Sequence, residues 1–217
     1  MAPSPIKPGP AELRSPGRIS PITRPPLSPL PGASMTRLLA TAALSFAVAA
    51  SAADKPDETG FAPLIGKDLT GWKVAPTGMK DKGGDALTGK TETPTKRFVL
   101  ADGVLTLDDK VKGDISITTE KTWAKDAHIQ FDFIPGKACN NDVYFRGIKF
   151  DIKPGDIKGC KVDEWNTFGF VVTGTDAEIK CNGESVKKVK AKAGATPFSI
   201  RAEGGPIQIK NLRVKAD

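Results

Sequence analysis

Short runs of alternating apolar and polar residues, separated by turn signals, are the feature that most constrains the fold of this chain. One clear case is 129–133, whose apolar residues would share one face of a strand and whose polar residues would share the other. The dipeptides Asp102-Gly103 and Asn182-Gly183 are typical of two-residue β-hairpins. The pattern favours an all-β sandwich or barrel, and of these we predict a two-sheet antiparallel jelly-roll sandwich over about residues 60–215.

The expected strands and core follow from the same alternation. The runs expected to form strands are 98–100, 104–107, 115–118, 129–133, 143–152, 167–172, 177–181, 186–190, 197–201 and 206–214. The core is expected to contain Phe131, Phe133, Phe168, Phe170, Phe198 and Ile200. The best candidate for a helix is 64–69, at one or two turns.

The N-terminal segment 1–34 is rich in proline and is expected to be disordered. It holds ten of the 18 prolines in the chain, and proline can complete neither a helix nor a sheet ladder. Two interpretations stay open. Either translation starts at Met35 and residues 1–34 are not made, or the segment is a genuine linker or export tail.

Residues 35–53 have the pattern of a secretory signal peptide. A basic start at Arg37 precedes an uncharged, alanine-rich run over 38–53, and small residues lie before Asp54. The run is short for a membrane span. We therefore expect cleavage near Ala52 or Ala53, export to the periplasm or the extracellular space, and no membrane span in the mature domain 54–217.

Net charge argues against nucleic-acid binding once its distribution is considered. The chain carries +7, but the first 53 residues hold five Lys/Arg and one Glu, which leaves 27 basic and 24 acidic residues in 54–217. Lysine is interleaved there with aspartate instead of clustering with aromatic residues. Residues 84–91 match a phosphate-binding loop, but 80–83 form no strand pattern and 92–94 no helix pattern, so we expect no nucleotide partner either.

Cysteine and histidine usage limits the redox and metal chemistry. Three cysteines permit at most one disulfide, for which Cys139 with Cys160 is the expected pair, and Cys181 is expected to be a buried thiol. The single histidine excludes sites that need two imidazoles. No cofactor is identified from the sequence. Oxygen ligands at 140–142 leave room for a divalent metal, although the same residues are typical of a turn.

The long run 143–152 contains the main candidate site. Strict alternation would place Arg146 among large apolar residues, which is a poor core. A β-bulge at Gly147 would shift the phase, so that Tyr144, Arg146, Lys149 and Asp151 face away from the core. That grouping offers a donor fork, an amine, a carboxylate and an aromatic platform, all useful toward a sugar. An ordinary polar outer face is the alternative interpretation.

An ordered set of segments resembles the 3-keto-disaccharide hydrolase family, a group of secreted domains in the concanavalin A-like lectin/glucanase superfamily. The segments that carry the resemblance, in family order over about 60–215, are Phe61–Trp72, Asp102–Leu105, Asn141–Gly147, Phe150–Lys153, Glu164–Thr167, Asn182-Gly183 and Lys210–Val214. The chain departs from the family where Asp151 and Lys153 replace Glu and Gln, and where the segment between Asp151 and Trp165 is short.

The resemblance implies a carbohydrate ligand and a secreted hydrolase or lyase that acts on 3-keto-glycosides. A 3-keto sugar has an acidified C2–H, so one base and one cation suffice for elimination of the anomeric substituent. We expect Asp151 as the base or metal ligand, with Arg146 or Lys149 at the enolate oxygen. Glu203 and Arg201 are the secondary candidates for these roles. The expected substrate-binding residues are Tyr144, Asn141, Trp165 and Glu203. A non-catalytic glycan-binding jelly-roll module is the alternative.

Overall fold

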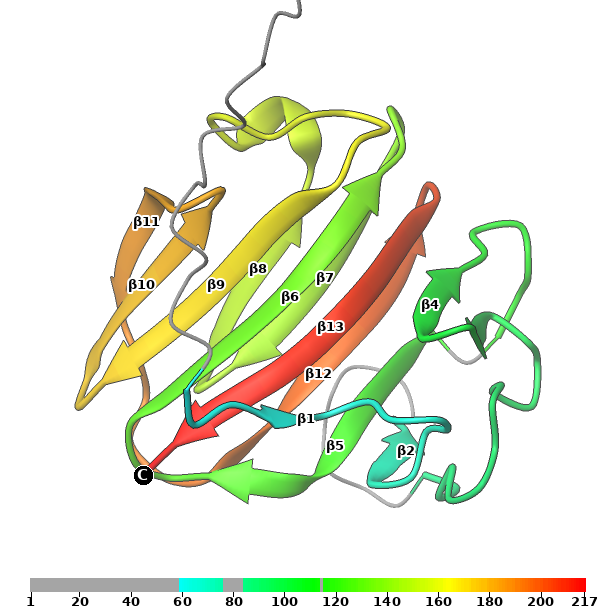
Figure 1. Cartoon of the computed structure of the whole chain (residues 1–217), viewed down its shortest axis with the longest axis horizontal. Helices are drawn as coiled ribbons and strands as arrows, with labels where there is room; N and C mark the ends of the chain where they lie inside the picture. Colours follow the sequence, from blue (N-terminus) through cyan, green and yellow to red (C-terminus); the bar gives the residue numbers. More distant parts are fainter. Residues whose placement is uncertain (1–58, 76–83, 114) are drawn as a thin grey trace, which may run out of the picture. The chain divides into compact units, whose positions relative to one another are not determined.

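The computed structural model describes residues 59–75, 84–113 and 115–217, which fold into two antiparallel β-sheets (Figure 1). By contacts the chain divides into units 1–51 and 52–217, and the described residues lie in the second unit. The expected N-terminal extension 1–34 and signal peptide 35–53 lie outside the described residues.

Sheet A contains eight strands, seven in the order β11-β10-β9-β6-β13-β4-β3, with β1 paired to β13. Its strands are β1 (Ala62–Pro63), β3 (Phe98–Ala101), β4 (Val104–Leu107), β6 (Ala127–Pro135), β9 (Asn166–Thr173), β10 (Asp176–Cys181), β11 (Glu184–Lys190) and β13 (Ile207–Ala216). Sheet B has the order β2-β5-β12-β7-β8. Its strands are β2 (Trp72–Val74), β5 (Ser116–Trp123), β7 (Asn140–Phe145), β8 (Ile148–Ile152) and β12 (Thr196–Gly204).

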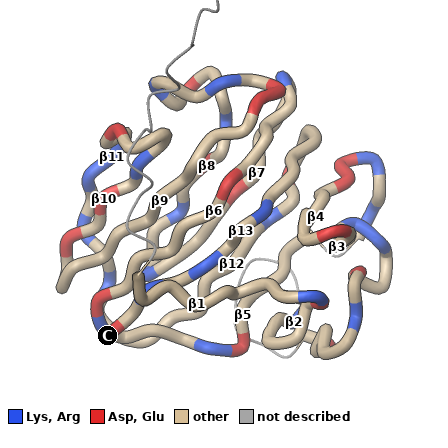
Figure 2. The backbone as a smooth tube through the Cα atoms, viewed as in Figure 1, with Lys and Arg blue, Asp and Glu red and all other residues tan. Residues whose placement is uncertain are grey.

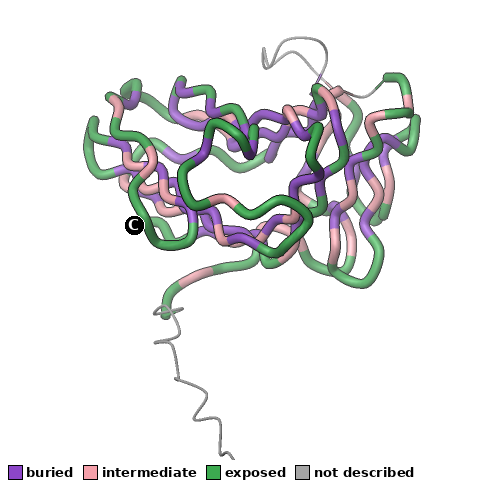
Figure 3. Tube along the Cα trace, turned by 90° about the horizontal axis from the view of Figure 1, so that it is seen from above, coloured by how far each residue is buried: buried purple, intermediate pink, exposed green. Residues whose placement is uncertain are grey.

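The two sheets pack face to face through aromatic side chains, and this confirms the predicted jelly roll. Phe145 of sheet B meets Phe170 of sheet A edge-on, with ring centroids 5.7 Å apart. All six residues expected in the core are buried. Seen from above, buried positions run along both layers, while exposed positions gather at the connections and the edges (Figure 3). Period-2 alternation succeeded because each sheet buries one face.

Both predicted two-residue hairpins are present. Asp102-Gly103 joins β3 to β4 and Asn182-Gly183 joins β10 to β11, and all four residues have positive φ. This backbone is the one that matches the right-handed twist of paired strands. A third such turn occurs at Arg146-Gly147, with φ of 50° and 73°, and it joins β7 to β8.

The expected single strand with a bulge at Gly147 is therefore wrong. The run 143–152 is two strands of a hairpin, although the inward residues are those that the shifted phase predicts. The sequence does not indicate this turn, because Arg rarely occupies the left-handed region of backbone conformation. Here the Arg146 guanidinium is buried and donates to the carbonyls of Lys192 at 2.8 Å, Ala124 at 2.9 Å and Lys125 at 3.0 Å. These bonds offset the cost of the unusual backbone.

Other local expectations need correction. Residues 64–69 form bends and no helix, and the one helix among the described residues is the short 3-10 segment η1 (Pro154–Asp156). All three cysteines are free. The predicted Cys139–Cys160 disulfide is wrong, because the Cys139 thiol donates to the Ile152 carbonyl, whereas Cys160 is hydrogen-bonded to Cys181. Cys181 is buried, as predicted.

Charged residues are distributed over the described chain without segregation by sign. Figure 2 shows basic and acidic positions alternating along β10, β11 and the connecting loops. Within the described ranges, no helix is long and apolar enough to span a membrane.

Candidate functional site

Two adjacent rows of polar side chains cross three neighbouring strands on the outer face of sheet B. In the first row, Arg201 of β12 pairs in register with Asp142 of β7, which pairs with Asp151 of β8. In the second row, Tyr144 lies between Ser199 and Lys149. Because side chains two residues apart project from the same face, the antiparallel register alone brings these groups together.

Asp142 lies at the centre of this polar cluster. Its side chain is 0% exposed, and its Oδ2 accepts hydrogen bonds from Arg201 Nη1 at 3.0 Å and from the Tyr144 hydroxyl at 3.2 Å. Its Oδ1 lies 3.3 Å from Lys149 Nζ. A carboxylate that is removed from water in this way requires such partners, because an isolated buried charge is strongly unfavourable.

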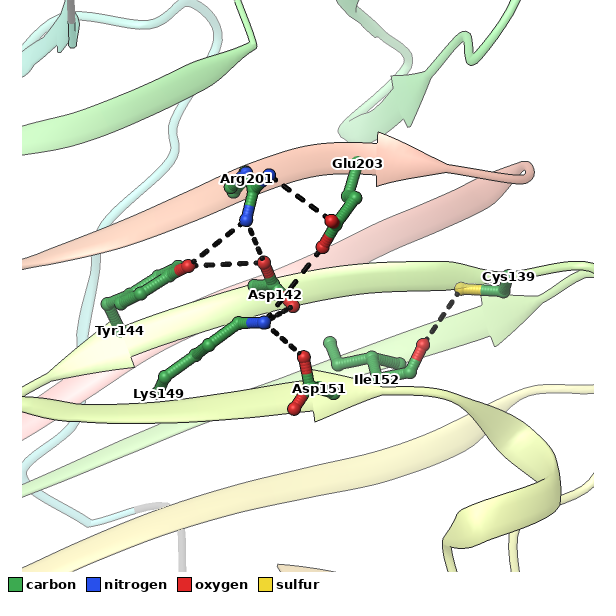
Figure 4. Close-up of polar contacts among 8 residues, drawn as sticks. All are labelled: Cys139, Asp142, Tyr144, Lys149, Asp151, Ile152, Arg201 and Glu203. Atoms are coloured by element: carbon green, nitrogen blue, oxygen red, sulfur yellow. Dashed lines mark hydrogen bonds and ion pairs between the residues drawn. The ribbon is translucent and has the colours of Figure 1, made fainter. Parts of the chain in front are cut away.

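The remaining members surround Asp142 and are partly exposed to solvent, and Figure 4 shows their contacts. Lys149 Nζ lies 2.5 Å from Asp151 Oδ1 and 4.0 Å from Glu203 Oε2. Arg201 Nη2 donates to Glu203 Oε1 at 3.2 Å. The Asp151 side chain is 51% exposed, so it can reach a ligand that Asp142 cannot.

The carboxylates of Asp142 and Asp151 lie close together and share one proton once the pH falls. Burial, and then the hydrogen bond with Asp151, raise the pKa of Asp142 to about 6. The same hydrogen bond, together with the Lys149 ammonium, lowers the pKa of Asp151. The hydrogen bond to Asp151 raises the pKa of Lys149, which keeps that amine cationic. At neutral pH the pair is therefore mostly ionised, and it takes up its first proton near pH 6.

A resident divalent metal does not fit this arrangement. Oxygens of Asp142, Asp151 and Glu203 lie within 4.8 Å of one another, a spacing that a metal could use. However, Lys149 Nζ already lies within ion-pair distance of an oxygen from each carboxylate. The ammonium supplies the positive charge at this point.

The structure brings together four of the seven predicted site residues, namely Tyr144, Lys149, Asp151 and Glu203. Arg146 is not among them. Its guanidinium points at backbone carbonyls of neighbouring loops, and its position beside Asp151 is taken by Lys149. The expectation that Arg146 shares a face with Asp151 is therefore wrong, because the bulge that would have placed it there is a turn.

Asn141 and Trp165 are also outside the cluster. Asn141 is buried on the inner face of β7, where its Nδ2 donates to the Gly205 carbonyl at 3.0 Å and to Cys139 Sγ at 3.2 Å. Trp165 precedes β9 of sheet A and is 39% exposed. Lys210 of β13 lies over its ring, with Nζ 3.7 Å from the centroid. Asn141 lies on the inner face because it is one residue out of phase with Asp142 on β7. Trp165 lies away from the cluster because it precedes β9, which belongs to the other sheet.

Sequence reasoning missed the central role of Asp142 and underrated Arg201. Asp142 had the composition of a turn, and Arg201 was a secondary candidate. The usable signal was the Arg146-Gly147 turn: a two-residue hairpin there pairs Asp142 directly with Asp151.

Comparisons with known proteins support the fold. No family model matches the sequence, and no curated protein matches it. Two solved structures from Parabacteroides distasonis, each named "putative glycosyl hydrolase", are similar in fold. The first has a TM-score of 0.55 at 18% identity and covers 73% of this chain and 94% of its own. The second has a TM-score of 0.52 at 13% identity, with 72% and 99% covered. At these identities the similarity establishes the two-sheet jelly-roll fold alone.

Proposed function

We propose that this protein is an exported carbohydrate-active enzyme that cleaves 3-keto-glycosides by C2 proton abstraction and elimination. The observation that carries the proposal is the Asp142–Asp151 pair, which lies between two cationic side chains on the outer face of sheet B. The ordered sequence resemblance to 3-keto-disaccharide hydrolases supplies the substrate class. The fold shared with the two Parabacteroides proteins is compatible with it.

The first step is a proton transfer from C2 of the sugar to the exposed Asp151 carboxylate. The electron pair left behind delocalises onto the C3 oxygen, so negative charge develops there. Lys149 and Arg201 lie beside the aspartates and can donate to that oxygen. Asp142, which is buried, acts as a positioning residue: it holds both cations and shares the incoming proton with Asp151.

The second step breaks the bond between C1 and the glycosidic oxygen. The enolate electron pair forms the C1=C2 double bond, and the bonding pair leaves with the aglycone oxygen. The protonated aspartate pair returns its proton to that oxygen, which regenerates the base. Water then adds across the double bond, with hydroxyl at C1 and hydrogen at C2, to give the free 3-keto sugar. Tyr144 and Glu203 border the pair and offer a hydroxyl and a carboxylate to the ring hydroxyls.

Release of 4-nitrophenol from a 4-nitrophenyl 3-keto-glucoside tests the proposal. We expect turnover by the wild-type chain and a loss of at least about 100-fold in Asp151→Asn, because the general base is removed. Asp156→Asn is the matched control, since Asp156 is an exposed aspartate of η1 paired with Lys153. Turnover in Asp151→Asn at the wild-type rate, with both variants folded, would contradict the assignment.

A non-catalytic glycan-binding module is the second candidate, and the partly exposed Trp165 ring, just before β9, favours it. An aromatic face of this kind can stack on a pyranose ring. If the wild-type chain binds oligosaccharides in titration calorimetry, if Trp165→Ala abolishes that binding, and if no 3-keto-glucoside is turned over, the module is the better description.

A further inference from the structure

Cys160 and Cys181 are held side by side by the backbone around them. Cys181 is the last residue of β10, and Cys160 lies in the connection between η1 and β9. The residue before Cys160 and the residue after Cys181 contact each other directly, since Asn182 Nδ2 donates to the Gly159 carbonyl at 2.9 Å. The Cys160 amide is fixed in turn by its bond to the Ile157 carbonyl at 3.1 Å. The connection thus has a defined position against the end of β10.

The two thiols contact each other, whereas the third cysteine has other partners. The Cys160 and Cys181 side chains lie close enough to shift each other's pKa. Cys139 is buried, donates to the Ile152 carbonyl at 3.2 Å and accepts from Asn141 Nδ2 at 3.2 Å. Of the other two cysteines, Cys181 and not Cys139 is therefore placed to form a disulfide with Cys160.

We propose that Cys160 and Cys181 form a disulfide when the protein meets a disulfide oxidant, and that this bond fastens the connection after η1 to the edge of sheet A. With glutathione disulfide as the oxidant, one cysteine thiolate displaces one glutathione to form a mixed disulfide. The second cysteine then displaces the other glutathione. Two thiols are oxidised, one glutathione disulfide is reduced to two glutathiones, and two protons pass to the released thiolates.

The environments of the two thiols set the order of these steps. Cys160 is half-buried, so an oxidant can reach it, and the hydrogen bond with Cys181 opposes the rise in its pKa that burial causes. Cys181 is 1% exposed, and burial together with the neighbouring Cys160 raises its pKa to about 12. Cys160 therefore attacks the oxidant first, and Cys181 resolves the mixed disulfide.

The bond closes a loop that contains all of β9 and all of β10 up to Cys181. A covalent link of this span restricts the unfolded chain, and by the size of such loops we expect reduction to lower Tm by about 6–12 °C. The site of this stabilisation is independent of the polar cluster on sheet B, so the proposal stands or falls separately from the proposed function.

The experiment uses the full chain, reduced and then equilibrated in a glutathione redox buffer, alkylated and mapped by peptide mass spectrometry. We expect a cross-linked peptide pair containing Cys160 and Cys181, with an intact mass lower by two hydrogens than that of the reduced chain. Cys139→Ser is the control and should keep the cross-link, whereas Cys160→Ser and Cys181→Ser should abolish it.

A comparison of Tm for the wild-type chain with and without a strong reductant gives a second readout that requires no variant to fold. A Cys139–Cys160 cross-link would overturn the proposal. So would a persistent glutathione adduct on Cys160, or complete alkylation of all three thiols after oxidation.

Discussion

Replacing Arg146 should destabilise the protein without any direct effect on the polar cluster. The side chain makes three hydrogen bonds of 2.8–3.0 Å to carbonyls of Lys192, Ala124 and Lys125. A fourth, to the Gly174 carbonyl, is weak at 3.5 Å. Hydrogen bonds from a charged donor each contribute about 1.5–3 kcal/mol. Because Ala124, Lys125 and Lys192 are exposed residues, we expect water to replace part of these bonds, so that Arg146→Met costs about 3–5 kcal/mol of unfolding free energy.

Arg146→Asn separates the guanidinium from the turn. Asn is favoured in the left-handed region, where residue 146 has φ of 50°, so it should recover about 1 kcal/mol relative to Met. Urea unfolding followed by tryptophan fluorescence measures both variants, since Trp72 and Trp123 are buried. Losses below about 1 kcal/mol in both variants, or loss of turnover at unchanged stability, would refute a structural role for Arg146.

Three further predictions concern the cluster and its surroundings. First, the logarithm of kcat/KM should fall with unit slope below about pH 6, because the first proton taken up by the Asp142–Asp151 pair occupies the base. A flat profile between pH 4.5 and 7.5 would contradict this expectation. Second, folding raises the pKa of Asp142, so the stability that Asp142 contributes is complete below the pKa of the unfolded chain and is lost as pH rises through about 6. The wild-type chain should therefore lose unfolding free energy relative to Asp142→Asn between pH 4 and 7.5. Third, Lys149→Met should destabilise the protein by about 1 kcal/mol at pH 8 and by less at pH 5. Without the ammonium, the carboxylates of Asp142, Asp151 and Glu203 repel one another, but only when they are ionised. Equal losses at both pH values in urea unfolding would count against Lys149 as the group that neutralises these carboxylates.

The sequence predicted the architecture well because burial on one face of a strand leaves a period-2 pattern in the residues themselves. The aromatic positions of 129–133 and 167–172 therefore pointed to the core directly. The two Asx-Gly hairpins were equally readable, since their residues favour positive φ.

The candidate site was only partly readable because it depends on which strands become neighbours. Asp151 and Lys149 emerged from alternation within one run, but Arg201 and Asp142 join them through pairing between β12, β7 and β8. Pairing between residues 59 positions apart, as for Arg201 and Asp142, leaves no local pattern. The expectation that Arg146 belongs to the site was wrong because an arginine with positive φ can be recognised only when the carbonyls that it binds are known.

The most direct test of the proposed chemistry is proton exchange at C2 of a 3-keto-glucoside, followed by NMR in deuterated water. If the Asp142–Asp151 pair removes this proton, the wild-type chain should replace C2–H with deuterium faster than buffer alone, and Asp151→Asn should not, while Asp156→Asn exchanges like the wild type. No exchange above buffer by a folded wild-type chain, at substrate concentrations where calorimetry shows binding, would contradict the proposal and favour the glycan-binding module.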